Sequence, residues 1–143
     1  MMLSGHIVAS SVTSFAFYGV TKSWPATLAC FLSGIFIDLD HVVDYCLIKR
    51  KWHCSFKQLK DFCLNDRQSK VYLFFHSIEL LALLWAAYFY YDMDVIWLGV
   101  LVGLSVHMAL DQLTNDVYPA TYSFIYRLKL GFPKRIFFKS EQH

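Results

Sequence analysis

The sequence predicts an all-α protein of four main antiparallel helices that is embedded in a membrane. Apolar residues make up 57% of the chain and the mean hydropathy is +0.40, both above the usual range for a soluble domain. Four apolar segments also approach the length of about 20 residues that a helix needs to cross a bilayer. At 143 residues we expect a single domain, with a core over 5–115 and a tail over 116–143.

The four apolar segments run over 5–21, 25–47, 71–91 and 95–113, and the first and last are marginal in length for a full crossing. The links within the first pair and within the last pair are short, which favours antiparallel helical hairpins. Ser23 and Asp94 stand where each could cap the helix that follows it. Pro25 suits the first turn of the second helix.

The polar connection 49–70 is expected to hold a short amphipathic helix, and the tail is expected to be irregular, aromatic and basic. Such a mixture of rings and cations suits a membrane interface. The candidate apolar and basic positions of the short helix are Phe56, Leu59, Lys60, Phe62 and Cys63.

The basic residues give the expected orientation. If all four segments cross, twelve of the 13 Lys and Arg residues fall on the side of the termini and the 49–70 connection, and Lys22 alone falls on the other. The positive-inside rule then predicts an inner (cytoplasmic) membrane protein with both termini in the cytoplasm. The alternative is a soluble four-helix protein whose long polar loops share one end. A net charge of only +2 gives no reason to expect nucleic acid, and we expect no cleaved signal peptide.

A cluster of polar residues interrupts the end of the second segment. Asp38, Asp40, His41 and Asp44 fall within seven residues, directly after an apolar run. A buried carboxylate needs a compensating cation. Asp38 and Asp40 point nearly opposite ways on a straight helix, so both can face one metal cluster only if the helix bends or ends there. We therefore expect Asp38 and His41 to bind directly, with Asp40 or Asp44 binding a second ion or orienting a ligand.

The other three segments carry His6, the pair His76 and Glu79, and the pair His107 and Asp111. Spacings of three and four residues place both members of a pair on one helix face. In an up-down-up-down arrangement all four polar sets fall at the same end, which is the predicted cytoplasmic end. The alternative for any single histidine is an ordinary buried core residue.

Imidazole and carboxylate together favour zinc, with manganese or iron as alternatives, and the charge count suits two or three divalent ions. The candidate metal ligands are His6, Asp38, His41, His76, His107 and Asp111. The candidate catalytic residues, as additional ligands, bridging groups or a general base, are Asp40, Asp44 and Glu79. Arg50, Lys51 and Arg127 could receive a substrate phosphate, or could be ordinary solvated charges.

The order His6, Gly34-x3-Asp38-x-Asp40-His41, His76-Ser77 and His107-x3-Asp111 resembles the bacterial inner-membrane-associated metal-dependent hydrolases, some described as LexA-regulated. That family is similar to the all-helical zinc-dependent phospholipase C and single-strand nuclease superfamily, whose zinc site also uses a His-x3-Asp pair. The chain has Ile37 where the family commonly has Pro, and one histidine of the third motif is absent. Glu79 is the candidate replacement for that ligand.

Together these features predict a membrane-bound, metal-dependent hydrolase that cleaves a phosphoester with metal-activated water, most simply in a lipid headgroup. Its expected partners are the lipid bilayer and a lipid or other phosphoester substrate. Two alternatives remain open: a divalent-metal transporter, and a non-catalytic membrane scaffold held together by a structural metal. The small polar residues Ser10, Ser11, Thr13 and Ser14 could serve a transporter or simply aid helix packing.

Overall fold

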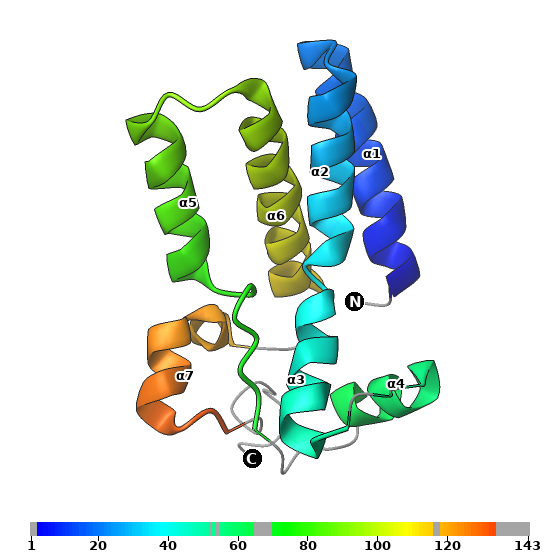
Figure 1. Cartoon of the computed structure of the whole chain (residues 1–143), viewed down its shortest axis with the longest axis vertical. Helices are drawn as coiled ribbons and strands as arrows, with labels where there is room; N and C mark the ends of the chain where they lie inside the picture. Colours follow the sequence, from blue (N-terminus) through cyan, green and yellow to red (C-terminus); the bar gives the residue numbers. More distant parts are fainter. Residues whose placement is uncertain (1–2, 52, 54, 65–69, 116–117, 134–143) are drawn as a thin grey trace. The chain divides into compact units, whose positions relative to one another are not determined.

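The computed structural model of the chain describes residues 3–51, 53, 55–64, 70–115 and 118–133 (Figure 1). These residues form seven α-helices and one 3-10 helix, joined by turns and extended segments. In chain order they are α1 (Leu3–Thr21), α2 (Trp24–Phe36), α3 (Leu39–Lys49), α4 (Phe56–Leu64), α5 (Ile78–Tyr90), α6 (Val95–Thr114), η1 (Pro119–Tyr122) and α7 (Phe124–Leu130). The all-α prediction is therefore confirmed for the described part of the chain.

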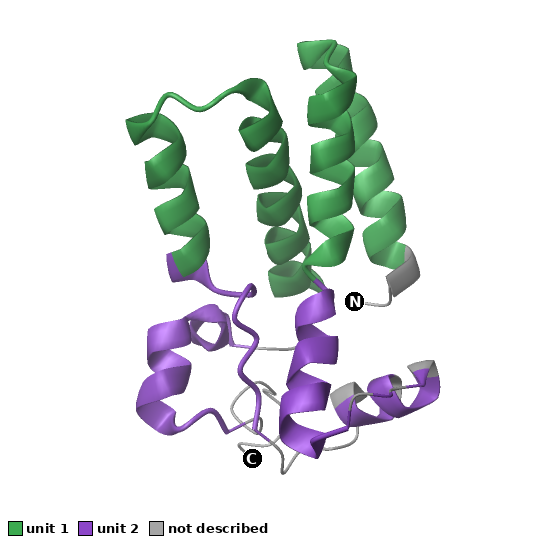
Figure 2. Ribbon diagram, viewed as in Figure 1, with its two compact units in different colours: residues 1–37, 80–115 green, residues 38–79, 116–143 purple. Residues whose placement is uncertain are grey.

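The contacts divide the chain into two compact units (Figure 2). Unit 1 comprises Met1–Ile37 and Leu80–Asn115, and unit 2 comprises Asp38–Glu79 and Asp116–His143. Each unit combines two separate stretches of sequence. The core of each unit therefore depends on contacts between residues distant in the chain.

The predicted caps are present. Ser23 Oγ accepts a hydrogen bond from the Ala26 N–H at the start of α2, at 3.4 Å. Asp94 Oδ1 accepts from the first turn of α6, at 2.9 Å from the Ile96 nitrogen. Each side chain satisfies an N–H that the first helical turn leaves without a partner.

The second predicted helix is divided in two, because α2 ends at Phe36 and α3 begins at Leu39. At this junction the His41 N–H donates to the Asp38 carbonyl, three residues back, at 3.1 Å. Such a bond tightens the backbone relative to an α-helix. The chain thus ends one helix just before the Asp38–Asp44 cluster and starts another through it.

Two other segments differ from expectation. The third predicted helix begins only at Ile78, after a non-helical stretch over 71–77 that bends at residues 74–76. The tail is not wholly irregular, since it contains η1 and α7. Ser123 Oγ caps α7 by accepting from the Tyr126 N–H at 3.1 Å, and Gly131 ends it at φ 75°, in the left-handed region that glycine adopts without strain. The rest of the tail, 134–143, lies outside the described residues.

Unit 1 is held by close contact between α2 and α6. A Cβ added at Gly99 would lie 2.2 Å from the Ala26 carbonyl oxygen, and one at Gly103 would lie 2.2 Å from the Cys30 carbonyl oxygen. The Ser33 hydroxyl also donates to the Val100 carbonyl across the two helices, at 3.0 Å. Small residues thus allow the two backbones to approach more closely than ordinary side chains permit, as in packed membrane helices.

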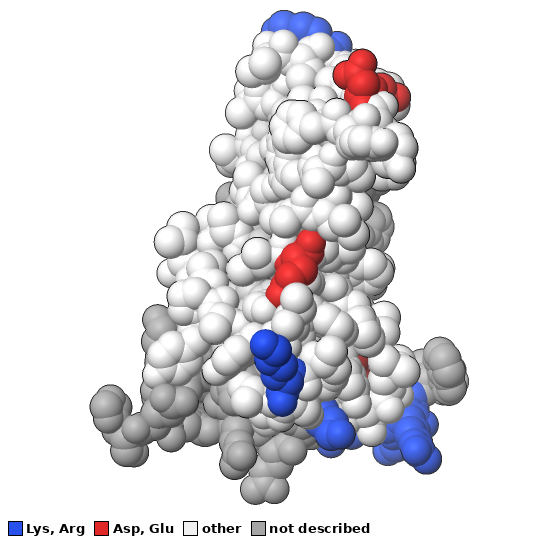
Figure 3. Space-filling view, turned by 90° about the vertical axis from the view of Figure 1, so that its left-hand side faces the viewer, with Lys and Arg blue, Asp and Glu red and all other residues white. Residues whose placement is uncertain are grey.

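The surface of unit 1 is apolar. The unit has only four charged side chains: Lys22, Asp92 and Asp94, which lie in the two links, and Asp111, which is buried. On the face shown in Figure 3 the helices of this unit present uncharged atoms, and charged atoms gather at its tip. Large apolar side chains are exposed along the helices, including Phe15 and Leu83. By length and composition two segments could cross a membrane, Trp24–Lys49 and Val95–Thr114.

We predict that Gly99→Ala lowers the free energy of unfolding by about 1–3 kcal/mol, because the added methyl must push α2 from α6. Thermal unfolding of the purified chain in a neutral detergent measures this change. Gly19→Ala is the matched control, since a Cβ at this helical position meets nothing within 4 Å. Equal unfolding temperatures for the two variants would contradict the proposed role of close α2–α6 packing.

Candidate metal centre

Three candidate ligands converge in unit 1. His6 lies near the start of α1, and His107 and Asp111 lie one turn apart near the end of α6. His6 Nε2 is 3.2 Å from Asp111 Oδ1, and His107 Nε2 is 3.5 Å from Asp111 Oδ2. The two imidazole rings stack with their centroids 4.0 Å apart. One ligand atom from each residue lies within 4.8 Å of the others, so this group can hold a metal ion.

The centre is almost completely enclosed. His6, His107 and Asp111 are exposed to 3%, 2% and 4% respectively. A carboxylate at this degree of burial is stable only with positive charge or several hydrogen-bond donors close by. The structure places His6 and His107 against the Asp111 carboxylate, and the Asn115 amide donates to Asp111 Oδ1 at 3.0 Å.

The carbonyl of Gly34 orients His107. His107 Nδ1 lies 2.7 Å from the Gly34 oxygen and, because a carbonyl only accepts, Nδ1 must carry the hydrogen. In the neutral ring Nε2 is then a lone pair that faces Asp111, also an acceptor. This contact is favourable only if a cation or a proton lies between the two groups. A backbone carbonyl on one ring nitrogen and a metal on the other is the usual arrangement of a ligating histidine.

His6 gives a second indication that this group suits a metal ion. Its Nδ1 atom is buried and has no hydrogen-bond partner among the described residues. Buried polar atoms without partners are rare, and an ion is one of their recognised explanations. Both histidines therefore fit the donor set that a divalent transition metal prefers.

In unit 2 the candidate carboxylates of α3 bind backbone. Asp44 accepts from the Tyr72 N–H at 2.8 Å and from the Leu73 N–H at 3.3 Å. Asp40 Oδ2 accepts from the Phe75 N–H at 2.6 Å and the His76 N–H at 3.2 Å. Both aspartates are fully buried. Spaced four residues apart on one face of α3, they accept from four backbone N–H groups of the non-helical segment 71–77.

Arg127 satisfies the acceptors of the same segment. Its guanidinium donates to the carbonyls of Tyr72, of Leu73 at 3.0 Å and of His76 at 2.9 Å. Burial lowers the pKa of the Arg127 guanidinium, while the nearby carboxylates of Asp40 and Asp44 raise it. Its side chain is 0% exposed and fully engaged. These contacts give Arg127 a structural role, and its burial makes the guanidinium poorly accessible to a substrate phosphate.

Glu79 joins the start of α5 to the start of α7. Its carboxylate accepts from the Ser77 hydroxyl at 2.8 Å, from the Phe124 N–H at 2.8 Å and from the Ser123 hydroxyl. A negative charge at the N-terminus of α7 is favourable because that end of a helix carries partial positive charge. Both oxygens of Glu79 are therefore engaged within unit 2.

The two candidate histidines of unit 2, His41 and His76, lie close to Asp38. His41 Nε2 and His76 Nε2 each lie 3.9 Å from Asp38 Oδ1, and His76 Nδ1 lies 3.3 Å from Asp40 Oδ2. Asp40 Oδ1 is buried without a hydrogen-bond partner in the described part of the chain. Since Asp40 is 0% exposed, this oxygen also fits a position next to a cation.

The two other candidate phosphate residues are on the surface. Arg50 ends α3 in the left-handed conformation and is exposed, and Lys51 is exposed beside it. Lys51 lines a pocket that is described below.

Sequence patterns did not identify Gly34 or Ser123 as contacts of candidate ligands, because a carbonyl acceptor and a capping hydroxyl have no distinctive sequence pattern.

Comparisons with protein-family models, with curated proteins and with solved structures found no match for this chain.

We predict that Arg127→Leu lowers the free energy of unfolding by about 3–5 kcal/mol, because it leaves two buried carboxylates and three carbonyls without their cation. Arg127→Lys should restore little, since one ammonium cannot match the planar guanidinium. Thermal unfolding and limited proteolysis of the full chain measure the change. Lys129→Leu on the exposed side of α7 is the matched control, and a loss of stability as large in the control would contradict this role for Arg127.

Proposed function

We propose that this chain is a membrane-embedded, metal-dependent hydrolase that cleaves a phosphoester, most simply in a lipid headgroup, at the cytoplasmic membrane face. The observation that carries the proposal is the buried group of His6, His107 and Asp111. The order of its ligand motifs, which resembles the bacterial inner-membrane metal-dependent hydrolases, supports the choice of a hydrolytic reaction.

The membrane part of the proposal is supported by unit 1 alone. Its exposed side chains are apolar, and its unburied charges are confined to the links Lys22–Ser23 and Tyr91–Asp94. With α1, α2, α5 and α6 crossing as four antiparallel helices, these links would face the side opposite the cytoplasm. α1 and α6 have 19 and 20 residues, which is close to the length needed for a crossing.

If α6 crosses the bilayer, the rise per residue along this helix gives the depth of the candidate metal centre in the membrane. Along α6, His107 lies about 20 Å and Asp111 about 26 Å from Asp94, at about 1.5 Å per residue. In a hydrocarbon layer of about 30 Å this depth is in the cytoplasmic third. An ionisable group inside a membrane indicates function by default. The phosphoester of a lipid lies just beyond that depth, which favours a lipid substrate.

His6, His107 and Asp111 would hold one ion, and Asp38, His41 and His76 are the candidates to hold another, with zinc favoured over manganese or iron. When bound, such ions lower the pKa of water towards neutrality and polarise a phosphoryl oxygen. The Gly34 carbonyl keeps the His107 ring in the tautomer that leaves Nε2 for a ligand. Asp40, with one oxygen on backbone and the other without a hydrogen-bond partner among the described residues, is the carboxylate best suited as ligand or general base.

Asp44 and Glu79 would then act as positioning residues. Asp44 fixes the segment that carries His76, and Glu79 fixes the start of α7 against the end of that segment. A transporter is less well supported, because the buried hydroxyl residues Ser10 and Ser14 lie within the packed helices of unit 1. A structural metal in a non-catalytic scaffold uses the same ligands, and the experiment below separates it from the hydrolase.

We predict that the full chain, purified in neutral detergent without chelators, carries stoichiometric zinc or manganese by elemental mass spectrometry. The double variant His107→Ala and Asp111→Asn should lose at least one ion per chain while circular dichroism shows the helices retained. His53→Ala with Asp92→Asn is the matched control, since both residues are exposed and lie outside the candidate ligands. Absence of stoichiometric metal from the wild-type chain would overturn the proposal.

A second assay distinguishes a catalytic metal from a structural one. It measures the release of headgroup phosphate from vesicles of phosphatidylglycerol or phosphatidylethanolamine. A hydrolase loses this activity on chelation, by at least about a hundredfold, and regains it with added metal. A scaffold unfolds on chelation and shows no metal-dependent release of phosphate.

A second prediction concerns orientation. In a chain with all four cysteines replaced by alanine, Tyr91→Cys should react with a membrane-impermeant maleimide on intact cells, because residue 91 lies in the link opposite the cytoplasm. Lys57→Cys is the control and should react only after the membrane is opened. Both sites lie on exposed residues of the chain. Labelling of both on intact cells, or the reverse pattern, would contradict the proposed topology.

A further inference from the structure

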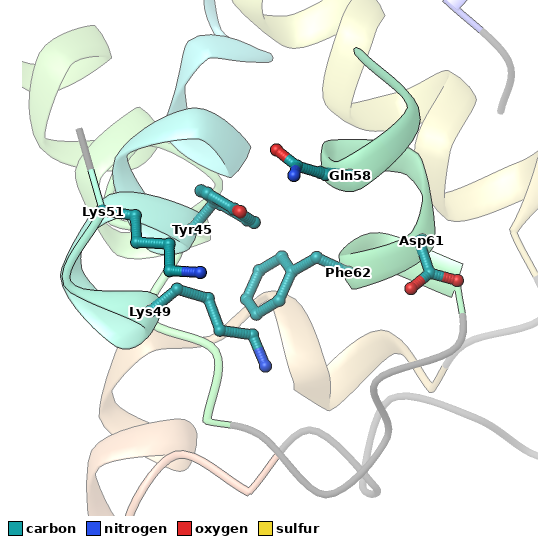
Figure 4. Close-up of a pocket in the computed structure, with 6 residues that line it drawn as sticks. All are labelled: Tyr45, Lys49, Lys51, Gln58, Asp61 and Phe62. Carbon is teal, nitrogen blue, oxygen red and sulfur yellow. The ribbon is translucent and has the colours of Figure 1, made fainter. Parts of the chain in front are cut away.

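Unit 2 contains a pocket that takes no part in the candidate metal centre. It lies between the end of α3 and α4 and has a volume of about 290 Å³ (Figure 4). Its lining residues are Tyr45, Lys49, Lys51, Gln58, Asp61 and Phe62. None of them is a candidate metal ligand.

The wall of the pocket is aromatic and well packed. Tyr45 and Phe62 are each exposed to only 5%, and their rings meet edge to face with centroids 5.5 Å apart. Such a pair is rigid and apolar. It provides a surface for the non-polar part of a ligand next to the polar groups at the rim.

Two lysines reach this wall because the chain reverses between them. Arg50 has φ 53° and ψ 35°, a left-handed conformation that ends α3 and turns the backbone. Lys49 Nζ lies 5.7 Å from the centre of the Phe62 ring. Figure 4 shows the Lys51 ammonium directed at the space between Tyr45 and Phe62. The turn thus brings two positive charges that are two residues apart to one aromatic wall.

The opposite side of the pocket is held by a reciprocal cap at the start of α4. The Ser55 N–H donates to Gln58 Oε1 at 3.1 Å, and the Gln58 N–H donates to Ser55 Oγ at 3.3 Å. This engagement of Oε1 leaves the amide NH2 of Gln58 as the group offered to a ligand. The Asp61 carboxylate lies beyond Phe62 and points away from the lysines (Figure 4).

We infer that this pocket binds the phosphate group of an anionic phosphoester. Lys49 and Lys51 give this wall of the pocket positive charge, which attracts an anion. Lysine ammoniums, an amide NH2 and the Tyr45 hydroxyl are all donors that suit phosphate oxygens. The inference does not rest on the proposed hydrolase activity, since the pocket shares no residue with the metal ligands.

The test measures binding to the full chain, as purified in neutral detergent, with two probes. Glycerol 3-phosphate, titrated by calorimetry, represents a free phosphoester. Phosphatidylglycerol, counted by native mass spectrometry against phosphatidylcholine, represents a lipid headgroup. Lys49→Met and Lys51→Met should each weaken binding by about tenfold, because each removes a charged donor. Asp61→Asn should strengthen it, and Lys129→Met, an equal loss of charge on exposed α7, should leave it unchanged.

Lysine-dependent binding of either probe supports the inference and identifies the source of the phosphate. Binding of glycerol 3-phosphate indicates a free phosphoester, and binding of phosphatidylglycerol alone indicates a headgroup. Failure of both probes to bind overturns the inference. A loss in Lys129→Met equal to that in Lys51→Met also overturns it, because attraction would then follow total charge. Thermal unfolding of each variant accompanies the binding data, so that a loss of fold is distinguished from a loss of binding.

Discussion

The non-helical segment 71–77 needs partners for its backbone N–H and C=O groups, and side chains of unit 2 supply many of them. A buried backbone polar group without a partner costs as much as a lost hydrogen bond. Here two carboxylates of α3 accept from four of the N–H groups, and one guanidinium of α7 donates to three of the carbonyls. Two buried negative charges then face one positive charge. Because one negative charge is left without a counter-charge, a further cation beside Asp40 would be favourable.

In unit 1 the orientation of a candidate ligand depends on how closely two helices pack. Gly103 allows α2 and α6 to approach until their backbones are almost in contact. At that separation the Gly34 carbonyl reaches the His107 ring and fixes its tautomer. A larger residue at the helix contact would move the carbonyl away from the ring. The orientation of one candidate ligand thus depends on a glycine that no ligand pattern includes.

The clustered aspartates illustrate how a ligand-rich motif divides between two tasks. Asp44 is fully used by backbone donors, while Asp40 uses one oxygen for backbone and leaves the other buried. A carboxylate held rigidly through one oxygen presents its other oxygen in a fixed position, which is what a metal site requires. The helix through these residues therefore serves both the frame of unit 2 and the proposed chemistry.

The helical class, the caps at Ser23 and Asp94 and the polar positions of the candidate centre could be predicted from the sequence alone, because periodicity, capping and ligand spacing are local properties. A bend or helix end at the Asp38 cluster was predicted only as the condition for Asp38 and Asp40 to face one metal cluster, and the structure does divide the helix there. The burial of Arg127 against three backbone carbonyls and the non-helical path of residues 71–77 were visible only in the folded chain. Those outcomes depend on hydrogen bonds between residues about 30 to 55 positions apart, which no local pattern encodes.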